Sequence, residues 1–138
     1  MLQSGLIANS VERISKSELK PTENGMPGEQ ELEKTIVLAD DIKMQARIEV
    51  TNKGNGVLKI SNLNVKVYDS HNDGSYYENW MLNIDFVDID GDGKKDLVIS
   101  GIVCFTDEKG DEVLRRESIV LIYILQSDLT FKQIYSNK

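Results

Sequence analysis

The sequence predicts an all-β protein, built as an antiparallel meander of about seven strands, and three observations carry this prediction. From Leu32 onward apolar residues alternate with polar ones, which is typical of strands with one buried face and one solvated face. Segments rich in Gly, Asn and Asp separate these runs and predict tight turns. β-Branched residues are frequent within the runs. Short connections favour an antiparallel curved sheet, sandwich or barrel.

Residues 1–31 differ from the rest and are expected to form an N-terminal arm or short helix, whereas residues 32–138 form the β domain. Both prolines lie in the first segment. Residues 9–20 carry a weak apolar stripe at helical spacing, formed by Val11, Ile14 and Leu19. A short helix over 9–20 and a loose arm are the two alternatives, because the proline at position 21 ends either one.

The strands expected in the second segment follow one another with short turns at 32–39, 43–51, 57–69, 78–88, 96–106, 112–125 and 130–136. The apolar parity changes at Ser61-Asn62, which we interpret as a β-bulge inside one strand. A turn is also expected at 71–74. Residues 119–125 are apolar on both faces, which predicts a central strand.

One nonapeptide, residues 88–96, specifies a chemistry. Its four carboxylates occupy loop positions 1, 3, 5 and 9 and belong to Asp88, Asp90, Asp92 and Asp96. Carboxylates so close together repel one another unless a cation neutralises them, and Ca²⁺ accepts six to eight oxygens in a flexible loop. Mg²⁺ fits less well, because it requires a strict octahedron and retains its waters. The sequence therefore predicts a calcium site.

The loop glycines and the lysine complete this prediction. Gly91 and Gly93 permit the positive φ angles that a tight turn needs. Lys94, at position 7, is expected to contribute its backbone carbonyl as a ligand. Two details argue against an EF-hand: its position 12 requires a bidentate Glu where this chain has Ile99, and the flanks alternate as strands. A strand–calcium loop–strand hairpin is the expected arrangement.

The run from Asp85 to Ile99 resembles a single FG-GAP or VCBS-type repeat, the calcium-binding hairpin of integrin α-chain propellers and of many bacterial surface proteins. The resemblance implies Ca²⁺ held by Asp88, Asp90, Asp92 and Asp96, with Lys94 supplying its main chain. It covers about fifteen residues and is specific to the loop. Propellers contain several such repeats and this chain has one, so the resemblance extends to the loop and not to a propeller.

Composition narrows the function class. The chain has 138 residues, the length of one domain, and a formal charge of −7, which disfavours a nucleic-acid partner. It has no long apolar segment that would predict a transmembrane span. Its single cysteine, Cys104, lies in an apolar run and is expected to be a buried thiol without a disulfide. Residues 1–9 are too short for a signal peptide. A low-affinity calcium loop functions best where Ca²⁺ is millimolar, which favours an extracytoplasmic location.

Several further residues have both a functional and a structural interpretation. Tyr76, Tyr77 and Trp80 could bind a glycan or a protein, although Trp80 shares parity with core residues and is expected to be buried. His71, Lys94, Lys95 and Lys109 are expected to be solvated. Glu78, Asp85 and Glu117 are the acids from which a glycosidase pair would have to come, but their spacing selects no pair.

The sequence contains no phosphate loop, nucleophile elbow, HExxH or CxxC motif, so we expect no enzyme activity. The leading hypothesis is a calcium-binding β module of an exported protein, with Ca²⁺ as a structural ion and a protein or glycan as its ligand. The alternatives are a small periplasmic inhibitor or accessory factor, and a glycan hydrolase using Asp85 or Glu78. No oligomeric state is predicted.

Overall fold

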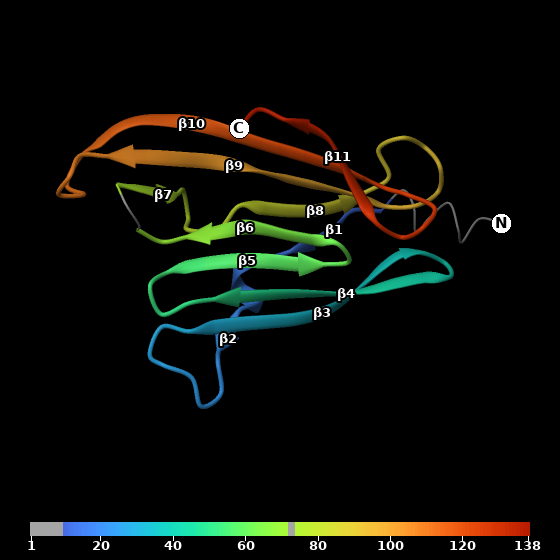
Figure 1. Ribbon diagram of the computed structural model, residues 1–138, viewed down its shortest axis with the longest axis horizontal. Coiled ribbons are helices and arrows are strands. Elements are labelled where there is room, and N and C mark those ends of the chain that lie inside the picture. The colour runs from blue at the N-terminus through green and yellow to red at the C-terminus, as the bar shows by residue number, and fades with distance from the viewer. Residues whose placement is uncertain (1–9, 72–73) are drawn as a thin grey trace.

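The computed structural model describes residues 10–71 and 74–138, which form an all-β fold of two antiparallel sheets (Figure 1). The all-β prediction is therefore confirmed, while the described residues form eleven strands rather than seven. No helix long and apolar enough to cross a membrane occurs within these ranges. Asn9 and the centre of the turn expected at 71–74 lie outside the described residues.

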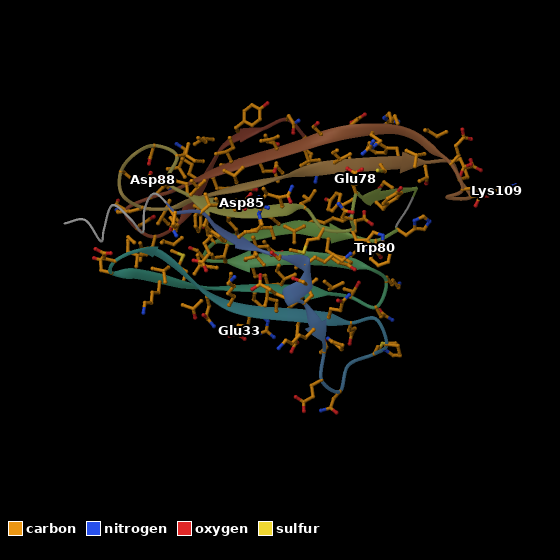
Figure 2. All side chains as sticks on the ribbon, turned by 180° about the vertical axis from the view of Figure 1, so that it is seen from behind. Glu33, Glu78, Trp80, Asp85, Asp88 and Lys109 are labelled. Atoms are coloured by element: carbon orange, nitrogen blue, oxygen red, sulfur yellow. The ribbon has the colours of Figure 1, made fainter. Side chains whose placement is uncertain are left out.

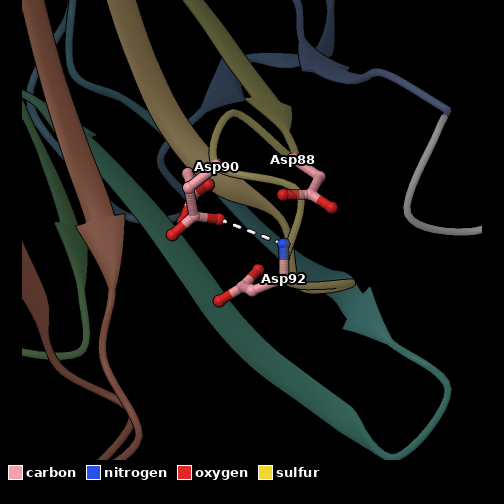
Figure 3. A group of neighbouring side chains, drawn as sticks. Asp88, Asp90 and Asp92 are labelled. Carbon is pink, nitrogen blue, oxygen red and sulfur yellow. Dashed lines mark hydrogen bonds between the residues drawn. The ribbon is translucent and has the colours of Figure 1, made fainter.

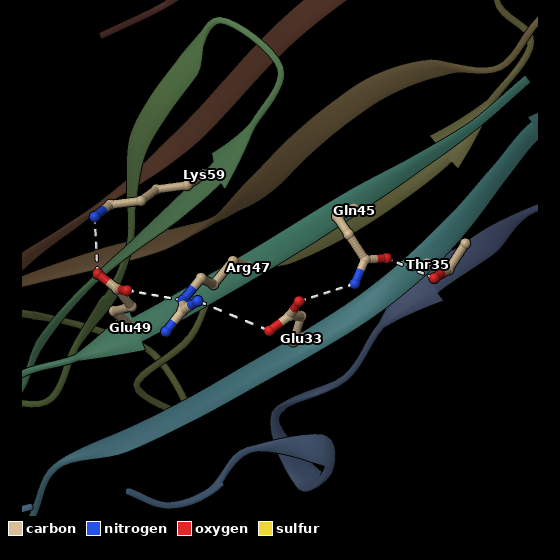
Figure 4. A network of polar contacts seen from close by, with 6 residues as sticks. All are labelled: Glu33, Thr35, Gln45, Arg47, Glu49 and Lys59. Carbon is tan, nitrogen blue, oxygen red and sulfur yellow. Dashed lines mark hydrogen bonds and ion pairs between the residues drawn. The ribbon is translucent and has the colours of Figure 1, made fainter.

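The first sheet is a meander in which each strand pairs with the next along the chain. Its strands, in spatial order, are β2 (Lys20–Pro21), β3 (Gln30–Ala39), β4 (Ile42–Val50), β5 (Asn55–Ile60) and β6 (Leu63–Asp69). Its outer face is polar, and six side chains on β3, β4 and β5 form a ladder of hydrogen bonds and ion pairs there (Figure 4): Glu33, Thr35, Gln45, Arg47, Glu49 and Lys59. This face is the solvated side that the alternating pattern predicted.

The second sheet contains the C-terminal half of the chain and one strand from the N-terminal segment. Its spatial order is β1 (Glu12–Ile14), β8 (Asn83–Val87), β9 (Asp96–Thr106), β10 (Val113–Leu125) and β11 (Phe131–Ser136). A further short strand, β7 (Ser75–Tyr77), pairs with β9 beyond the end of β8. Strand β10 has a partner on each side, as its two apolar faces predicted.

The two sheets enclose one core and are linked along one edge. Backbone hydrogen bonds join β6 to the segment before β8, from Asp69 N to Trp80 O and from Leu82 N to Val67 O, both 2.9 Å. The core side chains are contributed by both sheets, including Ile48, Leu58, Ile84, Phe86 and Leu97. The sheets therefore pack as one unit.

The short helix proposed for residues 9–20 is not formed in the described part of that segment. Residues 12–14 pair with β8 as β1, and after a 3₁₀ turn at Lys16–Glu18 residues 20–21 pair with β3 as β2. Ile14 is 1% exposed, and Arg13 forms an ion pair of 2.6 Å with Asp85 on β8. Sheet pairing and burial outweigh the weak helical stripe.

The predicted bulge at Ser61-Asn62 is a hairpin turn, so the strand expected over 57–69 is two strands. Ile60 pairs directly with Leu63, and Ser61 has a φ of 51°. A two-residue turn places residues three apart on the same face, which changes the apolar parity just as a bulge does. The change of apolar parity in the sequence therefore could not distinguish a β-bulge from a hairpin turn.

The strand expected over 78–88 is also interrupted. Asn79 and Trp80 have φ angles of 60° and 71°, which end the extended backbone between β7 and β8. Trp80 therefore no longer alternates in register with the core residues of β8 and is 47% exposed. The Nζ atom of Lys16 lies 4.9 Å from the centroid of its ring. The prediction that Trp80 is a core residue is wrong, whereas Tyr77 is buried. Cys104 is buried as predicted.

Candidate metal centre

The acidic loop connects β8 to β9 at one end of the molecule. Val87 pairs with Asp96, so the strand ladder closes directly beneath the loop. Figure 2 shows Asp88 and Asp85 towards this end, and Glu78, Trp80 and Lys109 towards the opposite one. The expected strand–loop–strand hairpin is thus formed, with the acidic residues on a loop anchored in a sheet.

The four aspartates of the loop converge. One carboxylate oxygen from each of Asp88, Asp90, Asp92 and Asp96 lies within 4.8 Å of the others. Two ligands on opposite sides of a Ca²⁺ are about 4.6–5.2 Å apart, because each Ca–O bond is about 2.3–2.6 Å. The four oxygens are therefore close enough together to hold one metal ion, and three of the side chains can be seen facing one another in Figure 3.

Backbone amides inside the loop hold Asp88 in place. Its two carboxylate oxygens accept hydrogen bonds from Gly91 N at 2.8 Å and from Gly93 N at 2.9 Å. Both glycines have left-handed backbones, with φ of 77° and 85°. A Cβ at either position would meet no atom within 4 Å, so the backbone conformation, and not crowding, favours glycine there.

Two further amides orient the central carboxylates. Asp92 N donates to Asp90 Oδ1 at 3.3 Å, and Lys94 N donates to Asp92 Oδ1 at 2.9 Å. Each aspartate thus turns back onto the amide two residues later, as Asx turns do. Lys94 lies between Asp92 and Asp96 and is half-buried. Its backbone carbonyl remains a proposed ligand.

Asp96 connects the loop to the rest of the second sheet. It is fully buried, and its two oxygens accept hydrogen bonds of 2.9 Å from Ile89 N in the loop and from Leu125 N at the end of β10. The neighbouring Lys95 N donates to Leu38 O on β3, in the other sheet, at 2.8 Å. The C-terminal end of the loop therefore contacts both sheets.

Burial and mutual repulsion raise the pKa values of two of the loop carboxyls. For Asp90, desolvation and the negative charges of Asp96 and Asp92 raise the pKa. For Asp96, desolvation raises the pKa, the bonds from Leu125 and Ile89 lower it in part, and the charges of Asp92 and Asp88 raise it further. A bound divalent cation would reverse these repulsions, because it favours the charged form of every carboxylate around it.

The other residues considered as functional are distributed away from this loop or are neutralised. Glu78 pairs with Arg116, Asp85 with Arg13, and Glu117 with Arg115. Asp85 is opposite Val98 on β9, and Glu78 N donates to Ile102 O, four residues further along the same strand. This offset is about 13 Å, which exceeds the separation of a glycosidase pair. Within the described ranges, the group of acidic side chains that could hold a metal ion is the set of four aspartates in the loop.

Two buried charged residues were not identified from the sequence. Lys95, expected to be solvated, is only 3% exposed. Asp69 is 1% exposed and lies at the end of β6. A signal for Asp69 was present, because it shares parity with the apolar Val65 and Val67, whereas Lys95 lies at the loop–strand junction, where no alternation exists.

Comparisons with protein-family models, with curated proteins and with solved structures found no match to this chain.

Proposed function

We propose that this chain is a calcium-binding, non-enzymatic β module of an exported protein, that Ca²⁺ is its structural ion, and that a protein or a glycan is its ligand. The single observation that carries the proposal is the convergence of four aspartate oxygens within 4.8 Å on one short loop. Oxygen ligands in a flexible, glycine-containing loop are the donor set that Ca²⁺ prefers. The proposed ligands are these four aspartates and the carbonyl of Lys94.

The position of the loop supports a structural role for the ion. A catalytic metal keeps a coordination position open for chemistry, whereas the ligands proposed here all come from one nonapeptide. Asp96 and Lys95 join the loop to β10 and to β3. An ion held by this loop would therefore reinforce the place where four strands and both sheets meet.

An exported location follows from the same chemistry. Ca²⁺ loops of low affinity are filled where calcium is millimolar, which is the case outside the cytosol. The hydrolase alternative gains no specific support, because each acid considered for hydrolysis is engaged by an arginine. Assays of the protein against glycans, peptides and phosphoesters are expected to show binding without turnover. Calcium-dependent turnover that a folded Asp92→Asn variant lacks would contradict the proposal.

Thermal unfolding with and without calcium tests the structural role. Free Ca²⁺ at a hundredfold its Kd should add about 2.7 kcal/mol to the free energy of unfolding, because the unfolded loop cannot present all of its ligands together. We expect EDTA to lower the Tm of the wild type and to leave the Tm of Asp90→Ala unchanged. Asp111→Ala, which removes an exposed carboxylate from another hairpin loop, should respond to EDTA as the wild type does. Identical melting curves of the wild type with calcium and with EDTA would contradict a structural ion.

A further inference from the structure

A cavity of about 300 Å³ is lined by residues of β6, β7, β9 and β10. Strand β7 lies at the end of the molecule away from the aspartate loop (Figure 1). The core-facing rows of β9 and β10 continue past the packed core into this cavity. On β9, Leu97 and Ile99 are buried, and the same row continues with Val103 and Phe105. The cavity is therefore an extension of the core-facing surface that other side chains leave unfilled.

A buried carboxylate faces this cavity. Asp69 lies at the end of β6, lines the cavity and is 1% exposed. Its Oδ2 accepts a hydrogen bond from Lys66 Nζ at 3.0 Å. Its Oδ1 is buried and accepts no hydrogen bond from any residue in the described ranges. A buried carboxylate oxygen without a donor costs free energy, so this atom favours a ligand that supplies one.

The charge balance around Asp69 selects a neutral donor. Lys66 already neutralises the carboxylate and lines the same cavity, so a ligand ammonium would meet a like charge. Burial and the negative charge of Asp69 raise the pKa of Tyr77 to about 12, so the Tyr77 phenol is uncharged at neutral pH. A hydroxyl group donates to Asp69 without adding charge to this site.

The walls of the cavity are apolar on one side and polar on the other. Tyr77, Val103, Phe105 and Ile119 supply the apolar surface. Glu117 and Ser118 add polar groups, and the guanidinium of Arg115 stacks 3.9 Å from the ring centroid of Phe105 at the rim. Small-molecule sites combine such apolar walls with a few placed polar groups, and a volume of about 300 Å³ is at the small end of their range.

We propose that this cavity binds one sugar unit of a neutral glycan, with a hydroxyl donating to Asp69 Oδ1 and the C–H face of the ring packing on Val103 and Phe105. The inference specifies the ligand class of the module proposed above. It depends on different residues from the calcium loop, so the two can fail separately.

Amide chemical shifts of the calcium-loaded, ¹⁵N-labelled protein test the inference, with glucose, galactose and N-acetylglucosamine as probes. We expect at least one sugar to cause saturable shifts at Asp69, Tyr77 and Phe105. Asp69→Asn should raise the Kd about tenfold or more. The reason is that the substitution replaces a charged acceptor with a neutral amide, which forms a weaker hydrogen bond with the sugar hydroxyl.

Controls separate this result from general effects. Glu49→Gln removes a carboxylate on the outer face of the first sheet and should leave the sugar Kd unchanged. Phe105→Ala removes an apolar wall without touching the pair of Asp69 and Lys66, so it should weaken binding even if Asp69→Asn does not fold. The inference would be overturned if none of the three sugars caused saturable shifts, or if the shifts occurred elsewhere on the protein. It would also be overturned if Asp69→Asn and Phe105→Ala both showed the same shifts as the wild type.

Methylammonium serves as a charged probe, and saturable shifts at Asp69 with methylammonium in place of the sugars would overturn the neutral-hydroxyl assignment. Sugar binding by a protein that binds no calcium would leave the cavity inference intact and remove the calcium proposal. Calcium binding by a protein that binds no sugar would leave the calcium proposal intact and overturn the cavity inference.

Discussion

At the scale of residues, Asp96 has two roles in the loop. It is one of the four converging carboxylates, and it also accepts backbone hydrogen bonds from Ile89 and Leu125. Each carboxylate oxygen has two lone pairs, so a backbone bond leaves a position for a cation. Asp88, by contrast, accepts its hydrogen bonds from two amides of the loop itself, among the residues that the structure describes. Asp96 would therefore link a bound ion to the sheet, while Asp88 shapes the loop itself.

The raised pKa values predict opposite effects of pH with and without calcium. In EDTA, the folded protein binds protons more readily at Asp90 and Asp96 than the unfolded chain does, so these two groups favour folding increasingly as the pH falls through their raised folded pKa values. With calcium present, protons compete with the ion for the same oxygens. The difference in Tm between calcium and EDTA should therefore shrink as the pH is lowered from about 7 to about 5. A difference that grows on acidification would contradict carboxylate coordination.

Gly91 provides a test of the loop backbone. Ala at a φ of 77° is expected to cost about 1–2 kcal/mol, although its Cβ would meet no atom within 4 Å. Asn enters the left-handed region more readily, so Gly91→Asn should retain more stability than Gly91→Ala. Urea unfolding in calcium measures both variants. Equal losses in Ala and Asn would mean that the left-handed conformation is not the reason for glycine.

At the scale of elements, β1 fixes the N-terminal segment to the second sheet. Ile14 is buried in the common core, whereas Val11 is 59% exposed just before the strand. The ion pair of Arg13 with Asp85 adds a contact at the surface, where such pairs contribute about 0–1 kcal/mol. The burial of Ile14 is therefore the main attachment of this strand.

Substitution of these two apolar residues separates an integral strand from a loose arm. Ile14→Ala should lower the free energy of unfolding by about 2–5 kcal/mol, because it removes a buried side chain and leaves a cavity. Val11→Ala, the matched exposed control, should change it by less than about 0.5 kcal/mol. Chemical denaturation of the two variants measures the difference. Similar small losses at both positions would indicate that residues 12–14 do not pack on the sheet.

The alternating pattern predicted most of the strands, because one face of each sheet is solvated. It failed where the backbone leaves the extended region. Ser61 and Trp80 both have left-handed φ angles that no periodicity reveals, so one predicted strand was two and an expected core residue is exposed. The convergence of the four aspartates was predictable because they are close together in sequence. Asp69 forms its cavity with residues of distant strands, and sequence spacing cannot bring these together.

At the scale of the whole molecule, the β8–β9 loop with its aspartates and strand β7 lie at opposite ends of the two sheets (Figure 1). The aspartate loop contacts β10 and β3, and strand β7 contributes to the cavity lined by Asp69. The packed core between them holds both sheets in a fixed relation. Calcium at the loop would stabilise this core as a whole, because the free energy of binding to the folded state adds to that of folding.

A crystal structure of the protein grown with millimolar calcium tests the central claim most directly. The account predicts one ion in the loop, identified by its anomalous signal, with oxygens of Asp88, Asp90, Asp92, Asp96 and the Lys94 carbonyl at about 2.3–2.6 Å. An empty loop with its carboxylates turned outward into solvent would contradict it.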